Sequence, residues 1–313
     1  MQILRKLLSS ILTLVLVSLM ILTVFQILPG NPARSILGVE ASDEQVARLE
    51  RELGLDKPLT ERYMEWVGGV SRGDFGTSLK YNTKVETLIR DRFPVTLVLT
   101  VYALVLTILI GLPLGVWIAA SDGKWYASFF ATLTQLGISI PAFWVGFFLI
   151  RLFSVRLGWF PTFGSNVLEG GFLHVIHQFF LPAIAVAIGN IAIAVRFLRS
   201  TILGELKKEY VRTARMKGLV KREWMMRHVL RNALIPVITV MGIITTSSIG
   251  GSIVIENVFA LPGLGSLMVQ SVSYRDFPLM QSLVLFVAML VVVINLLVDL
   301  TYQLIDPRMR TGD

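Results

Sequence analysis

Long stretches without charged side chains alternate with short charged segments along most of the chain. The apolar intervals cover residues 7–33, 93–121, 125–150, 170–195, 232–255 and 277–298. Each exceeds the roughly 20 residues that a helix needs to cross a hydrocarbon layer about 30 Å thick. In lipid every backbone amide must be hydrogen-bonded within its own segment, and these runs are continuously apolar, so we expect helices rather than barrel strands. The pattern predicts an all-α membrane protein with six transmembrane helices.

The first and third intervals carry additional signals. Arg5 and Lys6 precede an apolar stretch that continues to Leu28. This stretch is too long for the apolar region of an ordinary signal peptide, and no small-x-small cleavage site follows it, so we favour a retained helix. Pro113 and Pro141 lie inside the second and third intervals, where proline predicts a kink.

The segment between the first two spans has helical order of its own. Ser42-Asp-Glu-Gln45 is a capping-box pattern that predicts a helix start, and Gly54 is placed to end that helix. A second short helix is expected over residues 60–70, and a third begins near Thr83 and continues into the second span. Gly73-Asp-Phe-Gly76 is typical of a turn. We therefore expect a small helical appendage on one side of the membrane.

Composition and charge fix the orientation. The chain is 54% hydrophobic and 16% charged, whereas about 25% of an ordinary soluble domain is charged. Much of the net charge of +8 comes from residues 196–231, which contain eleven basic and three acidic residues. If six helices alternate, this segment and the basic residues at both chain ends lie on the same side. The positive-inside rule then predicts that both termini are cytoplasmic and that residues 31–92 lie outside.

Several chemistries are missing from the sequence. The chain has no cysteine, which excludes disulfides, thiolate catalysis and cysteine-ligated metal centres. Gly123-Lys124 is followed by Trp125 rather than Ser or Thr, so no Walker A loop is present. Glu256 and Asp299 lie near span ends, where capping or pairing with a neighbour is favoured over ion coupling. Energy for any active transport is therefore expected from another chain.

The segment at 196–231 is the most informative part of the sequence. Its apolar positions recur at helical spacing beneath a basic face, at Leu203, Leu206, Tyr210 and Ala214. Gly218 then interrupts the pattern as a residue able to take positive φ at a helix end, and a second helical stretch begins near Trp224. Three interpretations remain open: a docking element for a partner protein, a basic flank on anionic lipid, and nucleic-acid binding. The last is disfavoured because no groove-reading module accompanies the charge.

Two runs in and after this segment carry a family resemblance. Tyr210-Val-Arg-Thr-Ala-Arg-Met-Lys-Gly218 and His228-Val-Leu-Arg-Asn-Ala-Leu-Ile-Pro236 resemble the coupling motif of binding-protein-dependent ABC importer permeases. The match is closest to the branch that carries dipeptides, oligopeptides, glutathione and nickel. In the generic motif Glu-Ala-Ala precedes the glycine, whereas Arg212-Thr-Ala214 stands at that place here. Arg212 thus departs from the generic motif at the position of its glutamate.

The resemblance extends over nearly the whole chain. Further matching runs are Pro29-Gly-Asn-Pro32 (with Asn31 in place of the family's Asp), Leu53-Gly-Leu-Asp-Lys-Pro58, Gly73-Asp-Phe-Gly76, Arg92-Phe-Pro94, Ser139-Ile-Pro-Ala-Phe-Trp144, Leu157-Gly-Trp-Phe-Pro161, Gly250-Gly251, Glu256, Pro262-Gly-Leu-Gly265, Arg275-Asp276 and Asp306-Pro-Arg308. Each run alone is a weak signal. Their common order and spacing make the resemblance specific.

The resemblance implies a complex in a bacterial inner membrane. The expected partners are a second homologous permease, two ATPase subunits and an external solute-binding protein. This chain is then non-catalytic and binds no cofactor, since ATP and Mg²⁺ are held by the ATPases. The implied division is a first transmembrane helix at 1–30, an external helical segment at 31–92, and a permease core at 93–313. A cytoplasmic coupling helix lies between helices four and five. The implied coupling residues are Tyr210, Arg212, Thr213, Ala214 and Gly218.

The cargo implied by the resemblance is a dipeptide or oligopeptide. Nickel, a metal chelate and glutathione remain alternatives, because selection is largely made by the binding protein. His174 and His177 share a helical face and permit a nickel-relay hypothesis, although an interfacial structural pair is favoured. A stand-alone secondary transporter or channel, and a scaffold without transport activity, are the alternatives from other classes. The sequence does not identify the residues that line the pathway. Ala214 is interpreted as a small residue that lets a partner surface approach closely.

Overall fold

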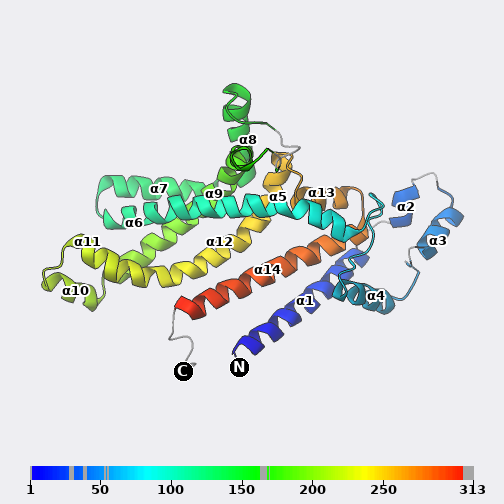
Figure 1. Ribbon diagram of the computed structural model, residues 1–313, viewed down its shortest axis with the longest axis horizontal. Helices are drawn as coiled ribbons and strands as arrows, with labels where there is room; N and C mark the ends of the chain where they lie inside the picture. The colour runs from blue at the N-terminus through cyan, green and yellow to red at the C-terminus, as the bar shows by residue number, and fades with distance from the viewer. Residues whose placement is uncertain are drawn as a thin grey trace. The chain divides into compact units, whose positions relative to one another are not determined.

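A computed structural model describes residues 2–27, 32–37, 41–52, 54, 56–162, 168 and 170–305. Within these ranges the ordered elements are helices (Figure 1). The one β-bridge among the described residues joins Thr77 and Lys84. The predicted all-α class is confirmed. The runs Pro29-Gly-Asn31 and Asp306-Pro-Arg308 lie outside the described residues, as does the side chain of Asp299.

Five helical stretches are long and apolar enough to cross a membrane: Lys6–Val24, Val85–Ala120, Phe172–Glu205, Lys221–Val258 and Phe277–Val298. The first lies within α1 (Gln2–Ile27). The second joins α5 (Val85–Leu106), a π-helical turn (Thr107–Gly111) and α6 (Leu112–Ala120). The third is α9 (Phe172–Glu205). The fourth joins α11 (Lys221–Trp224), a π-helical turn (Met225–Leu230) and α12 (Arg231–Val258). The fifth lies within α14 (Phe277–Ile305). These stretches account for five of the six predicted spans.

The third predicted span is not one helix. It consists of α7 (Trp125–Ser139) and a second arm, Ala142–Arg156, formed by α8 (Ala142–Leu149) and a π-helical turn, and the two arms are bent by 100°. Ile140 lies at the break with an extended backbone, φ −89° and ψ 123°. A proline ring disfavours the α conformation of the preceding residue, which explains why α7 ends there. Pro141 therefore breaks the predicted span rather than merely kinking it.

The chain divides into two compact units. The first contains Met1–Pro94 and Pro262–Val293, and the second contains Val95–Leu261 and Ile294–Asp313. The first unit includes the short helices α2 (Pro32–Leu37), α3 (Asp43–Glu52), α4 (Leu59–Ser71) and α13 (Leu264–Ser273). The apolar pattern predicts α3 and α4 closely, whereas α2 and α13 were not expected. α2 has only six residues, too few to show a helical period. α13 is as long as α3 but begins after Gly263 without a side-chain cap, so it lacks the start signal that marks α3.

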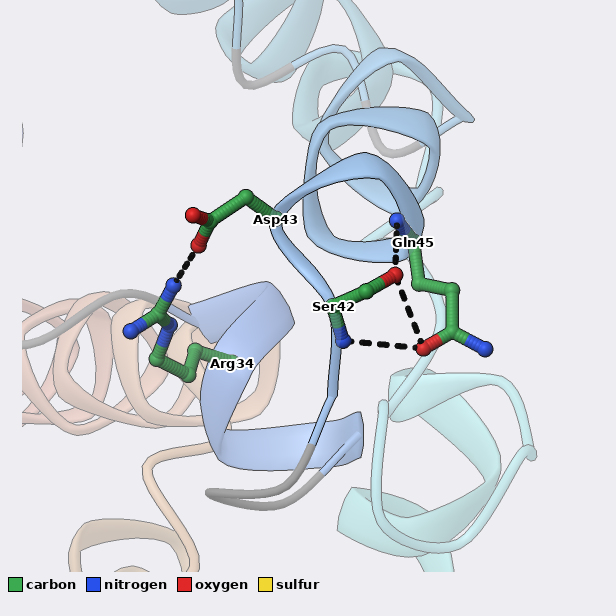
Figure 2. A network of polar contacts seen from close by, with 4 residues as sticks. All are labelled: Arg34, Ser42, Asp43 and Gln45. Atoms are coloured by element: carbon green, nitrogen blue, oxygen red, sulfur yellow. Dashed lines mark hydrogen bonds and ion pairs between the residues drawn. The ribbon is translucent and has the colours of Figure 1, made fainter.

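The predicted capping box is present at the start of α3. The amide of Ser42 donates to the Gln45 side-chain oxygen at 3.0 Å, and the amide of Gln45 donates to the Ser42 hydroxyl at 3.3 Å (Figure 2). Two backbone donors at the helix start are thereby satisfied, as the capping-box principle requires. Arg34 of α2 also pairs with Asp43 at this end (Figure 2).

A buried carboxylate organises the loop between α4 and α5. Asp276 is 1% exposed and precedes α14. It accepts hydrogen bonds from the Ser78 hydroxyl at 2.5 Å, the Lys80 amide at 3.1 Å and the Leu279 amide at 3.2 Å. Asp276 therefore caps α14 and holds the preceding loop in one conformation. Gly73 and Gly76 in that loop have φ of +84° and +86°, which confirms the predicted turn.

In the second unit, α9 is the central helix and packs against α6, α7, α8 and α12. Many of its buried side chains are alanines, which allow neighbouring helices to approach closely. Two polar pairs are buried in this unit. The Asn190 amide donates to the Ser248 hydroxyl at 2.8 Å, and the Thr96 hydroxyl donates to Glu256 at 2.6 Å. Glu256 is fully buried, and its contact with Thr96 agrees with the structural role favoured from the sequence.

Candidate functional site

The candidate site is the projection between α9 and α12, built from α10 (Glu209–Met216), the turn at Gly218 and α11. The sequence predicts one continuous stripe from Leu203 to Ala214, but α9 ends at Glu205 and α10 begins at Glu209. Lys208, between them, is extended with φ −78° and ψ 148°. The predicted single helix is therefore two helices, and the stripe is divided between them.

A buried carboxylate stabilises this break. Glu205 is 8% exposed and accepts hydrogen bonds from the Lys208 ammonium and the Tyr210 hydroxyl, both at 2.6 Å. Burial of the Tyr210 phenol, followed by its hydrogen bond to Glu205, raises the pKa of Tyr210 above its ordinary value. The hydroxyl therefore stays protonated at neutral pH and remains a donor. Tyr210, predicted as a coupling residue, connects α10 to the end of α9.

The inner face of α10 packs on its own chain. Val211 and Ala214 are 1% and 7% exposed and belong to a cluster with Trp224, Met225 and Val229. The two arms of the projection are thus closed against each other by apolar contacts. The side chain of Ala214 faces this intramolecular cluster. Ala214 is therefore buried by packing inside the projection, whereas the sequence predicts that its small side chain lets a partner surface approach closely.

The turn between the arms depends on Gly218. Its φ is +75°, and its amide donates to the Arg215 carbonyl at 3.0 Å. The predicted positive φ at a helix end is confirmed. No atom lies within 4 Å of the position that a Cβ would take. Glycine is therefore required by the backbone conformation and not by lack of space, because a left-handed conformation disfavours other residues.

The outer face of the projection is exposed, basic and partly apolar. Arg212 and Thr213 are both exposed, and the Thr213 hydroxyl donates back to the Glu209 carbonyl at 3.1 Å. Four apolar side chains in this part of the projection are 37–72% exposed, and we call them the apolar tip: Met216, Leu219, Val220 and Met226. Exposed basic residues, Arg215, Lys217, Lys221 and Arg222, lie next to the members of the apolar tip along the chain. Clustered exposed apolar side chains with a polar rim mark a protein contact rather than a nucleic-acid groove.

Three contacts in and beside the projection are not evident from the sequence. The Lys221 ammonium donates to the Ala120 carbonyl at the end of α6, at 2.8 Å. Arg199 of α9 pairs with Asp122 at 2.7 Å. The guanidinium of Arg215 lies 4.5 Å from the centre of the Trp224 ring. Eleven basic residues occur in this segment, and nothing in their spacing distinguishes these three, so only the folded chain identifies them.

The histidines at the start of α9 are held by local contacts. A ring nitrogen of His177 lies 2.9 Å from the Trp159 carbonyl, and the ring stacks on Phe160 at 4.9 Å. A ring nitrogen of His174 lies 3.3 Å from the Gln178 amide nitrogen. No group of three histidines and carboxylates able to hold a metal occurs in the part of the chain that the structure describes. His177 thus anchors the loop that follows α8.

The sequence is similar to known membrane components of transport systems. Residues 111–311 match a family described as binding-protein-dependent transport system inner membrane component, and residues 1–100 match the N-terminal part of such components. A putative peptide transport system permease protein of Brucella abortus is 39% identical over 98% of both chains. The glutathione transport system permease protein GsiC of Salmonella typhimurium is equally similar, at 39% over 98% of both chains.

The fold has a counterpart among solved structures. An inward-facing conformation of the MetNI methionine ABC transporter contains a chain that matches with a TM-score of 0.58 and 19% identity. The match covers 70% of this chain and 96% of that one. The helical arrangement and the family match over most of the sequence lead to one conclusion: this chain belongs to the family of binding-protein-dependent transport system inner membrane components.

Proposed function

We propose that this chain is the permease subunit of an ATP-driven importer of dipeptides or oligopeptides and forms half of the translocation pathway. The observation that carries the proposal is the projection between α9 and α12, whose exposed apolar tip is flanked along the chain by exposed basic residues. The 39% identity to a peptide transport permease over 98% of both chains supports the peptide cargo.

The projection is built to transmit movement. Tyr210 and Lys208 connect α10 to α9 through Glu205, and Lys221 connects α11 to α6. Met225 and Val229 continue directly into α12 and pack against the inner face of α10. A force on the tip therefore reaches three membrane helices without passing through a loose loop. If an ATPase groove holds the tip, closure of an ATPase dimer would shift α6, α9 and α12 together, as a two-state coupling requires.

The proposal includes the remaining parts of the complex. Two ATPase subunits bind ATP and Mg²⁺, a second homologous permease completes the pathway, and an external solute-binding protein delivers the cargo. This chain contributes no catalytic residue and no cofactor site. It lies in a bacterial cytoplasmic membrane with both termini inside. The family description and the apolar helices support a membrane location, and the distribution of basic residues supports the orientation.

If the ATPase subunits alone bind ATP, hydrolysis is expected in the assembled complex and not in this chain. The purified chain alone is expected to show no ATP turnover, because it lacks a Walker A loop. The assembled complex is expected to hydrolyse ATP faster when loaded binding protein is added to it in proteoliposomes. Both expectations are tested by measuring the rate of phosphate release in each preparation. Turnover by the isolated chain, in a preparation shown to contain no ATPase, would contradict the assignment.

The orientation predicts which residues are accessible from outside. The chain has no native cysteine, so a single Glu50→Cys substitution in α3, where the Glu50 side chain is half-buried, provides a unique label site. An impermeant maleimide added to intact spheroplasts is expected to label this cysteine fully. A matched Arg222→Cys variant in the projection is expected to react only after the membrane is opened. The reverse pattern would place the external segment inside the cell.

Glutathione is the second candidate cargo, since the GsiC permease is as similar to this chain as the peptide permease is. Uptake of labelled dipeptide and labelled glutathione by cells with the complete system separates the two. The compound whose uptake is lost when this chain is deleted is the cargo.

A further inference from the structure

A cavity in the first unit is not used by the proposed transport mechanism. Its volume is about 340 Å³, and helices α1, α4 and α14 and the loop before α5 form its walls. The lining includes Leu22, Arg62, Trp66, Leu79, Phe277 and Gln281. Much of the wall is apolar, and the polar groups come from α4 and α14.

The cavity lies at the level where a membrane meets water. Leu22 is two residues from the end of the candidate span Lys6–Val24, and Phe277 is the first residue of the candidate span Phe277–Val298. The two spans therefore place the cavity at the depth of lipid headgroups and glycerol. Trp and Arg side chains are typical of this depth, because they combine an apolar body with polar hydrogen atoms.

Hydrogen bonds between distant segments hold the walls in place. The hydroxyls of Ser18 in α1 and Tyr63 in α4 are 2.8 Å apart. The Ser282 hydroxyl of α14 donates to the Phe75 carbonyl in the loop, also at 2.8 Å. Asp276 fixes the same loop through Ser78. The cavity is thus a formed part of the fold rather than a gap between independent helices.

Two hydrogen-bond donors in the wall, the Trp66 indole and the Arg62 guanidinium, lack acceptors among the described residues. The indole nitrogen of Trp66 is buried and has no hydrogen-bond partner among the described residues. The guanidinium of Arg62 forms no hydrogen bond or ion pair with any residue that the structure describes. The one carboxylate in the lining, Glu65, is bound by Lys57 at 2.5 Å, and this contact raises the pKa of Lys57. Lys57 also lies 3.5 Å from Glu61, which is not in the lining. The guanidinium of Arg62 is therefore the charged group in the lining that has no partner among the described residues, and an unpaired buried N–H such as that of Trp66 is unfavourable.

We propose that this cavity binds an anionic phospholipid, with the phosphate at Arg62 and a glycerol or ester oxygen near Trp66. The apolar walls formed by Leu22, Leu79 and Phe277 would cover the first methylene groups of an acyl chain. A soluble anion would gain nothing from these walls. A basic pocket between membrane helices, at headgroup depth and with an apolar floor, matches the chemistry of a lipid headgroup site.

Native mass spectrometry of the full-length chain tests the proposal. The purified chain is delipidated in detergent and titrated with phosphatidylglycerol, and the binding constant of the tightest site is measured. Arg62→Gln is expected to weaken this site by about fivefold, the effect of one basic residue near anionic lipid. Trp66→Phe keeps the ring and removes the N–H, and it is expected to weaken the site about two- to fivefold, as loss of a hydrogen bond does. Arg72→Gln, at the exposed end of α4, is the matched control and is expected to have no effect.

A competition experiment distinguishes binding of a lipid from binding of a simple anion. Glycerol 3-phosphate and inorganic phosphate are added as competitors, and neither is expected to displace the lipid at millimolar concentration. Displacement by either would show an anion site without an acyl requirement and overturn the proposal. If Arg62→Gln and Arg72→Gln weakened lipid binding equally, the effect would come from general surface charge, and the proposal would be overturned as well. Arg62→Lys preserves the charge, so it is expected to retain binding and shows that loss in Arg62→Gln does not reflect misfolding.

Discussion

Replacement of Gly218 by valine is expected to abolish uptake while the chain remains inserted in the membrane. The left-handed conformation at this turn disfavours a residue with a side chain by about 1–2 kcal/mol, and a β-branched residue is a clear outlier there. The space around Gly218 is open, so no steric clash adds to this effect. The valine is expected to shift the turn to a conformation that separates the two arms of the projection. Cargo uptake and the amount of ATPase that co-purifies with the chain are both measured on the same membranes.

Two variants serve as controls for Gly218→Val. Gly218→Asn is expected to retain most of the uptake, because asparagine tolerates the left-handed conformation far better than valine. Gly204→Ala, in the last turn of α9, adds a side chain where no atom lies within 4 Å and where the backbone is helical. It is expected to be neutral. Normal uptake by Gly218→Val with a full complement of ATPase would show that the projection is only a basic flank, and the coupling assignment would be wrong.

Replacement of Ala214 by aspartate is expected to lower both uptake and the amount of folded chain. Ala214 lies in the cluster with Trp224, Met225 and Val229, and a charge placed there loses its hydration without gaining a partner. Such a change is unfavourable by several kcal/mol. The sequence alone predicts loss of transport with normal abundance, because it interprets Ala214 as a surface contact. Burial of Ala214 changes that expectation.

The adjacent residue provides the matched control for Ala214→Asp. Thr213→Asp introduces the same charge one position away, on the exposed face of α10. It is expected to leave abundance unchanged and to reduce only ATPase association, since a negative charge enters a basic docking surface. Abundance by immunoblot and thermal aggregation of the detergent-solubilised chain distinguish the two variants. Equal abundance of Ala214→Asp and the unsubstituted chain would indicate that the inner face of α10 opens toward a partner.

Local sequence signals determined much of this fold. Uninterrupted apolar runs predicted five membrane helices correctly, because a helix in lipid needs length and low charge more than any particular contact. Ser42 and Gln45 predicted the start of α3, and Gly218 predicted the left-handed turn, since caps and positive φ depend on one or a few neighbouring residues. The family resemblance rests on the same kind of information, namely short motifs in a fixed order.

Tertiary structure decided the features that depend on distant residues. Pro141 is a local signal, but nothing local specifies that the two arms beside it diverge by 100°. The break between α9 and α10 follows from the buried carboxylate of Glu205 and its two donors, which an amphipathic stripe does not reveal. Ala214 has the same small side chain whether it faces a partner or its own chain, and only packing against Trp224 decides between these. Periodicity reports that one side of a helix is apolar, whereas the identity of what covers that side is fixed by the folded chain.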